Sequence, residues 1–187
     1  NIPITVVQIM GAASKDKPEV DAMDLAKQLA RAYGGKYHYL YAPLCVEDKE
    51  VRDKLMREPY IQDAISLARN ADIILTSVGA ADFVMTTPLW RGYMDSYTLH
   101  ILQSKGAVGH IGGHFYDIKG RMVDTELDEK LIGISLEDIK KAPNVICIAG
   151  SVSKAKALLG AIRGGYVDTL IIDDATALRI LELNKEF

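Results

Sequence analysis

The segment from Asn144 to Ala177 constrains the fold more than any other part of the chain. Its first part, Val145 to Ala149, is a continuous apolar run, which is typical of a parallel strand buried on both faces. A turn at Gly150 follows, and either Ser151 or Ser153 is suited to cap a helix. The segment therefore begins as a buried strand that turns directly into a helix.

The same segment continues as a helix and a second strand. Gly164 and Gly165 end the helix, and Thr169 to Ile172 predict the next parallel strand. The residues that share one helical face are Ala155, Leu158, Leu159 and Ile162. Ligands of such strand–helix–strand units bind where strand C-termini meet helix N-termini.

Lys154 lies at that junction, in the first turn of the predicted helix. The helix dipole disfavours a cation there by about a few tenths of a kcal/mol. A lysine in this position is best explained by an anion that binds beside it. The spacing alone leaves an ordinary exposed helix lysine open.

The composition predicts one domain with one sizeable core, because the chain has 187 residues and is 49% hydrophobic. The net charge is −3 without a basic cluster, so no nucleic-acid surface is predicted. Two cysteines, Cys45 and Cys147, are too few for a disulfide framework, and we expect a reducing cytoplasm. No run of about 18 apolar residues predicts a membrane span. Because the chain starts at Asn1 without methionine, we interpret it as a fragment.

Strands and helices alternate along the rest of the chain. Predicted strands cover 4–9, 36–41 and 73–78, and predicted helices cover 20–33, 49–57, 59–70, 94–103 and 174–184. Residues 81–90 are predicted as a loop of mixed character, and 115–121 as a hairpin or turn in which Gly120 takes a positive φ. Ser135 and Asp138 resemble a capping box for a short helix. The alternation predicts an α/β domain with a mainly parallel sheet.

Several polar or small residues fall at the ends of these strands. Gln8, Gly11, Gly79 and Lys154 lie at or just beyond predicted strand C-termini, which indicates a pocket at one edge of the sheet. Asp173 also follows a strand, where it could act as a general base or cap the closing helix.

A metal site is not expected. His110, His114 and Asp117 carry suitable ligand atoms, but strand residues four apart are separated by about 13 Å and could share an ion only across a tight loop. The chain also lacks a Walker A sequence, a GxGxxG after a strand, HExxH and CxxC, so no cofactor is expected.

Two long blocks are similar to one known family. GAVGHIGGHFYDIKGR and LIGISLEDIKKAPNVICIAGSVSKAKALLGAIRGGYVDTLIIDDATA resemble the effector-binding domain of the SorC/DeoR-type bacterial sugar-responsive regulators. The likeness extends to VVQIMG, YAPLCVEDKEVRDKL, ADIILTSVGA and the RGY that begins at Arg91, and so covers nearly the whole chain. It implies that residues 1–187 form a Rossmann-like domain with a mainly parallel sheet flanked by helices, as in the ribose-5-phosphate isomerase and glucosamine-6-phosphate deaminase fold.

The resemblance also implies partners. Such a domain binds a phosphorylated sugar or sugar-like effector and assembles as a homodimer or homotetramer. Operator DNA is bound only by an N-terminal helix-turn-helix domain, which this chain lacks.

Carried over residue by residue, the resemblance assigns Lys154 to the effector, commonly to its phosphate. Met10 stands where some members place a lysine or arginine, so a cationic contact or Schiff base is excluded there. His110 stands where most members have Asp or Glu bonding sugar hydroxyls, which implies a different ligand preference. The implied ligand site, with no catalytic residue, comprises Gln8, Met10, Gly11, Gly79, Arg91, His110, Lys154 and Asp173.

Two other functions stay open. The chain could be a sugar-phosphate isomerase or deaminase on the same fold, with Asp173 as its base. It could also be an oligomerisation module whose pocket no longer binds a ligand, which Met10 and His110 suggest.

Overall fold

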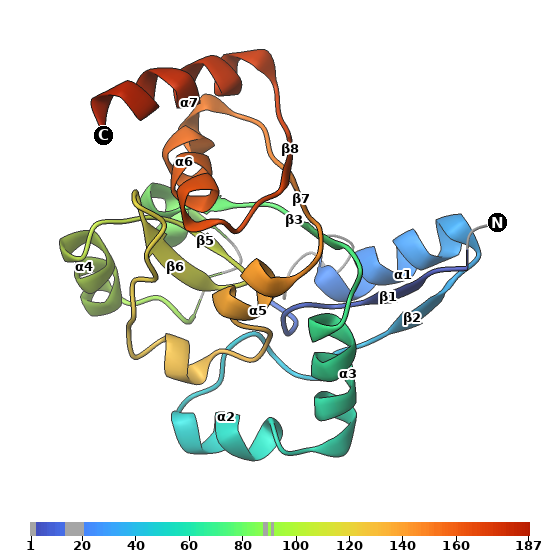
Figure 1. Cartoon of the computed structure of the whole chain (residues 1–187). Helices are drawn as coiled ribbons and strands as arrows, with labels where there is room; N and C mark the ends of the chain where they lie inside the picture. Colours follow the sequence, from blue (N-terminus) through green and yellow to red (C-terminus); the bar gives the residue numbers. More distant parts are fainter. Residues whose placement is uncertain (1–2, 14–20, 88–89, 91) are drawn as a thin grey trace.

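Small sheets, not one continuous sheet, form the framework of the computed structural model (Figure 1), which describes residues 3–13, 21–87, 90 and 92–187. Two are parallel, with strand orders β1-β2 and β3-β7-β8, and one is antiparallel, with order β4-β5-β6. The strands are β1 (Thr5–Val7), β2 (Lys36–His38), β3 (Ile74–Thr76), β4 (Gly79–Ala80), β5 (Ala107–Ile111), β6 (His114–Asp117), β7 (Val145–Ile148) and β8 (Thr169–Ile171). The α/β class is confirmed, but the single predicted sheet is divided.

Helices cover the sheets and form the periphery of the molecule (Figure 1). The α-helices are α1 (Ala22–Tyr33), α2 (Lys49–Leu55), α3 (Pro59–Arg69), α4 (Ser96–Ser104), α5 (Leu136–Lys141), α6 (Ala155–Gly164) and α7 (Asp174–Glu186). Short 3-10 helices are η2 (Ala81–Thr86), η4 (Asp128–Lys130) and η5 (Val152–Lys154). The capping box of Ser135 and Asp138 is confirmed at α5. The loop prediction for 81–90 is wrong over η2, since this stretch lacks the longer helical periodicity that sequence patterns detect.

The predicted strand–helix–strand unit is confirmed as β7, η5, α6 and β8, with β7 and β8 parallel. α6 begins directly after η5 and ends at Gly164, and its C-cap Gly165 takes a left-handed φ of 72°. Cys147 is fully buried within β7, as the apolar run predicts.

A tight hairpin joins β5 and β6. Gly112 (φ 59°) and Gly113 (φ 97°) both take positive φ, which a two-residue hairpin turn of this kind requires. The sequence prediction found only the β6 side of this structure, together with the positive φ of Gly120, which is 76°. The antiparallel sheet therefore arises from two glycines that interrupt the alternation of helix and parallel strand.

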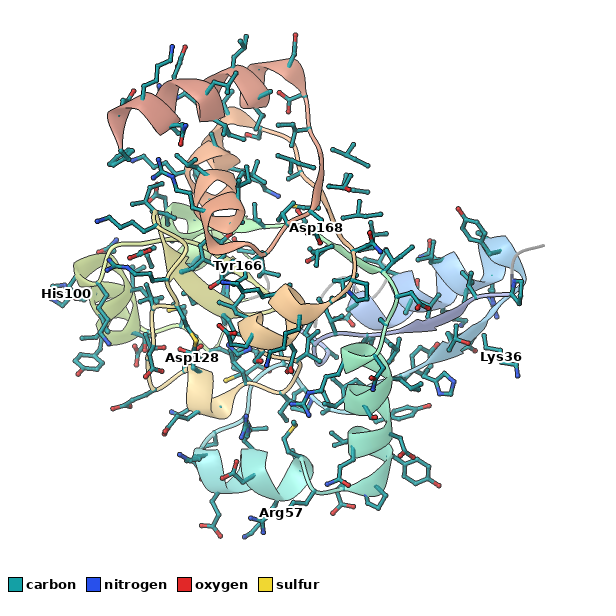
Figure 2. All side chains as sticks on the ribbon, in the orientation of Figure 1. Lys36, Arg57, His100, Asp128, Tyr166 and Asp168 are labelled. Carbon is teal, nitrogen blue, oxygen red and sulfur yellow. The ribbon has the colours of Figure 1, made fainter. Side chains whose placement is uncertain are left out.

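The hairpin separates two apolar clusters. Phe115 lies in a smaller cluster with Trp90, whereas the next residue, Tyr116, lies in the main core with α6 and β7. Consecutive residues of a strand face opposite sides, so one strand contributes to both clusters. Near the centre of the molecule, the Tyr166 hydroxyl donates to the Gly120 carbonyl at 2.8 Å and holds the end of the hairpin (Figure 2).

Small residues let α6 pack closely against this hairpin. A Cβ atom on Gly109 of β5 would lie 2.5 Å from the Cβ of Ala157. A Cβ atom on Gly160 would lie 2.7 Å from the carbonyl oxygen of Asp117. The helix and the hairpin therefore touch through backbone, with no room for a side chain between them.

None of the helices in the described part of the chain is long and apolar enough to cross a membrane.

We expect Gly160→Ala to lower the free energy of unfolding by roughly 1–2 kcal/mol, because overpacking outweighs the gain of about 1 kcal/mol in helix propensity. Urea denaturation measures this change. Lys156→Ala, at an exposed position of the same helix, serves as the control and should stay within about 0.5 kcal/mol of the wild type. A Gly160→Ala protein as stable as the wild type would contradict the close contact.

Candidate ligand-binding site

Lys154 occupies the C-terminal edge of the parallel β3-β7-β8 sheet. β3 and β7 are parallel neighbours, so the segments that leave them, which carry Ser77 and Lys154, lie side by side. Lys154 is a partly buried residue, and its exposed Nζ donates to Ser77 Oγ over a long 3.5 Å. Within the described segments, no carboxylate lies at ion-pair distance from it.

The turn before Lys154 has an unusual backbone. Ser151 has a φ of 96°, the one positive φ of a non-glycine residue in the described part of the chain. Such conformations cost about 1–3 kcal/mol and persist only where the surroundings fix them. Here the Ser151 carbonyl accepts from Lys154 N at 2.9 Å, and its hydroxyl lies 2.8 Å from that of Ser153.

Asp173 fixes this turn from the neighbouring strand. Its Oδ2 accepts from Ser151 N at 3.1 Å and from Thr176 Oγ1 at 2.8 Å, and its Oδ1 accepts from Thr176 N at 2.8 Å. The main-chain N–H of Thr176, the N–H of Ser151 and the Thr176 hydroxyl lower the pKa of Asp173 to about 2. Asp173 is therefore the N-cap of α7 and a weak base, with three donors already on its oxygens.

Gly79 and His110 oppose each other across the β4–β5 pair. A Cβ atom on Gly79 would lie 2.0 Å from His110 Nε2, so the imidazole ring itself requires a glycine there. His110 is 7% exposed, and Trp90 Nε1 donates to its Nε2 at 3.2 Å. Burial, and then the charge of Lys154, lower the pKa of His110 to about 4, which keeps the ring neutral.

Trp90 contacts the candidate site and was missed by sequence reasoning. It is 1% exposed, and its ring lies 5.2 Å from that of His110 and 5.3 Å from that of Phe115 between centroids. The available signal was that the chain has a single tryptophan, at the end of a stretch predicted as a loop. Ser77 carried no signal, because a lone serine after a strand is common in turns.

Gln8, Met10 and Gly11 lie where the segment after β1 packs against the segment after β2. Gln8 is 3% exposed; its Oε1 accepts from Leu40 N at 2.9 Å, and its Nε2 donates to the Met10 carbonyl at 3.4 Å. A Cβ atom on Gly11 would lie 2.3 Å from the Pro43 carbonyl oxygen, so the chain itself approaches this glycine.

These three residues follow β1, whereas the Lys154 turn follows β7 of another sheet, although Met10 packs at the margin of the cluster that contains Trp90. The structure brings Gly79, His110 and Lys154 together and joins Asp173 to them through Ser151. Arg91, also predicted for the site, falls outside the described residues.

The two histidines of the hairpin face opposite sides. His110 pairs with Phe115, and His114 pairs with Ile111, so neighbouring pairs project to opposite faces. His114 Nδ1 lies 3.0 Å from Asp128 Oδ1, within the molecule below β6 (Figure 2). The tight loop that a shared ion would need does exist, yet the imidazoles diverge. Among the described residues no group of three or more His, Cys, Asp or Glu side chains could hold a metal ion.

A surface hollow of about 410 Å³ lies near α2 and α3, away from these residues. Its walls are almost entirely apolar, and it is lined by Tyr41, Leu55, Glu58, Tyr60 and Ile61. None of the predicted site residues that the structure describes contributes to it, and its described lining offers no cation to an anionic ligand.

The chain is similar to a family of sugar-binding domains and to transcriptional regulators. The family model described as "Putative sugar-binding domain" matches residues 2–182. The transcriptional regulator YjhU of Escherichia coli K12 is 31% identical over 93% of this chain and 52% of its own length. The deoxyribonucleoside regulator of Bacillus subtilis 168 is 29% identical over 93% of this chain and 55% of its own length. The full-length sorbitol operon regulator SorC of Klebsiella pneumoniae has the same fold, with a TM-score of 0.88 and 24% identity over 95% of this chain and 57% of that one. The chain spans about half the length of the curated relatives it matches.

Removing the unusual backbone conformation should stabilise the protein. We expect Ser151→Gly to raise the free energy of unfolding by about 1 kcal/mol, because glycine takes a positive φ without steric conflict. Ser153→Gly, in η5, should lower it by roughly 0.5–1 kcal/mol. Thermal unfolding compares the stability of the two variants with that of the wild type. If both variants lost the same amount of stability, strain at Ser151 would be excluded.

The contribution of Asp173 should depend on pH. Its folded-state pKa of about 2 lies below the value of about 3.9 for an unfolded aspartate, so its stabilisation is present above about pH 4 and is lost as the pH falls towards 2. We expect the Tm difference between wild type and Asp173→Asn to shrink over this range. Asp174→Asn is the control, because the Asp174 carboxylate accepts only from Ala175 N within the described segments. A difference that is constant with pH would contradict this assignment.

Proposed function

The chain belongs to the sugar-binding domain family of SorC/DeoR-type transcriptional regulators, and we propose that it senses a phosphorylated sugar or sugar-like metabolite for a cytoplasmic regulator of carbohydrate metabolism. The effector binds at the C-terminal edge of the β3-β7-β8 sheet. Operator DNA is contacted by a helix-turn-helix domain outside this chain, and the effector changes that contact through a homodimer or homotetramer.

The observation that carries this proposal is Lys154 at the C-terminal edge of the sheet, without a carboxylate partner among the described residues. Among the described residues, its single side-chain hydrogen bond runs over 3.5 Å to a neutral hydroxyl, so its charge has no ionic partner there. A phosphate beside Nζ supplies charge-assisted hydrogen bonds of the strong kind.

The relatives support a sugar-derived effector and not a catalytic role. They are transcriptional regulators, and two carry names that refer to deoxyribonucleosides and sorbitol. The one appealing base, Asp173, is an ionised helix cap whose pKa is about 2, which makes proton abstraction near neutral pH inefficient.

The route from ligand to partner subunit begins at the same turn. An anion on Lys154 restrains the turn, Asp173 joins that turn to the first residues of α7, and α7 exposes Leu178 and Leu181 on one side. In the proposed oligomer this apolar side of α7 packs on a partner subunit. The coupling requires that the ligand bind two packing states with different affinities, typically by about 1–3 kcal/mol.

We expect Lys154→Ala to abolish the thermal stabilisation that phosphorylated sugars or polyols give the wild type. A hundredfold excess over Kd stabilises by about 2.7 kcal/mol, which a thermal-shift screen detects readily. The screen compares phosphorylated sugars and polyols with their free forms.

Lys156→Ala is the matched control, because it removes the same charge from an exposed position two residues further on. It should respond as the wild type does. Full stabilisation of Lys154→Ala would remove Lys154 from the site, and no response of the wild type to any compound would refute a phosphorylated effector.

A further inference from the structure

Trp90 determines which nitrogen of His110 carries the proton. An indole N–H only donates, so His110 Nε2, at 3.2 Å from Trp90 Nε1, must be an unprotonated acceptor. The buried ring stays neutral at physiological pH, with a pKa of about 4. A neutral imidazole carries one proton, which therefore resides on Nδ1. His110 thus presents an N–H donor on the side of the ring away from Trp90.

No described residue accepts a hydrogen bond from this Nδ1–H. Within the described segments, the Tyr116 hydroxyl is the polar side-chain atom that is both fully buried and without a partner. His110 Nδ1 does not meet both conditions. The Nδ1–H donor therefore has no acceptor among the described residues, and a ligand group can supply one.

The groups around this donor lack a free carboxylate. Lys154 is close enough for its charge to lower the His110 pKa, and it donates to Ser77, two residues before the glycine that faces the His110 ring. Asp173, the carboxylate at the same turn, already accepts three hydrogen bonds. The described site thus combines a cation and an N–H donor with no side-chain carboxylate free to accept.

Such a site distinguishes ligand groups by their hydrogen-bonding capacity. A ligand hydroxyl can accept from Nδ1–H, but its own proton then needs an acceptor, and leaving a buried donor unpaired costs about 1–3 kcal/mol. A carboxylate only accepts, and its charge strengthens each hydrogen bond that it receives.

We propose that His110, held by Trp90 as the Nδ1–H tautomer, is a specificity-determining residue that selects a phosphorylated sugar acid over the corresponding polyol phosphate. This inference rests on the proposed function and names the chemical class of its ligand. The ligand phosphate binds Lys154, and its carboxylate accepts from His110 Nδ1.

Isothermal titration of the full chain with two matched pairs tests this selection. The pairs are 6-phosphogluconate with sorbitol 6-phosphate, and ribonate 5-phosphate with ribitol 5-phosphate. The members of each pair share the chain length and the phosphate, and they differ at C1, where one has a carboxylate and the other a hydroxymethyl group. We expect the acid of at least one pair to bind at least tenfold more tightly than its polyol.

Two variants then ask whether His110 sets the preference. His110→Asp replaces the donor by an acceptor-only group and should reverse the preference. Trp90→Phe keeps an aromatic ring but removes the indole donor, so both tautomers become available and the preference should fall at least severalfold. This second variant introduces no buried charge and keeps the test valid if His110→Asp does not fold.

The control is His100→Asn, at an exposed position of α4 on the margin of the molecule (Figure 2), and it should keep the wild-type preference. Equal or tighter binding of the polyol phosphates would overturn the inference and leave the proposed function standing, as would an acid preference that survives both variants. If none of the four compounds binds, the inference is overturned. The proposed function is refuted only if the wider sugar-phosphate screen also gives no thermal stabilisation.

Discussion

The contact between α6 and the β5–β6 hairpin is the constraint on which the rest of the structure depends. Gly109, Ala157 and Gly160 bring helix and strands together at backbone distance, and nothing larger fits. This contact places the N-terminal end of α6, and with it Lys154, relative to the strand that carries His110. The candidate site is thus positioned by packing among residues that have no polar side chain.

The electrostatics of the site follow from that placement. Burial against Trp90 and Phe115 keeps His110 neutral, and the nearby ammonium of Lys154 adds to the effect. The pKa of Asp173 is lowered for a different reason. Main-chain and hydroxyl donors stabilise the negative charge of this carboxylate at the start of α7. The turn between them can keep the φ of 96° at Ser151 because hydrogen bonds fix it from both sides.

Local patterns in the sequence predicted much of the fold and part of the site. The strand–helix–strand unit, the capping box at Ser135 and the junction position of Lys154 all depend on residues close together in the chain. What was missed depends on distant partners: the hydrogen bond from Trp90 to His110 spans 20 residues, and the bond from Leu40 to the Gln8 amide spans 32. The β5–β6 hairpin was missed because no strand was predicted before its turn at Gly112 and Gly113.

The hairpin has a consequence for how such a domain can diversify. β5 directs Gly109 towards α6 and the next residue, His110, towards the aromatic cluster beside the candidate site. Adjacent codons therefore encode two separate properties in the proposed site, since residue 109 determines how tightly the helix docks and residue 110 is proposed to select the chemical group of the ligand. If so, a substitution at position 110 redirects recognition while the scaffold, which depends on position 109, is inherited unchanged.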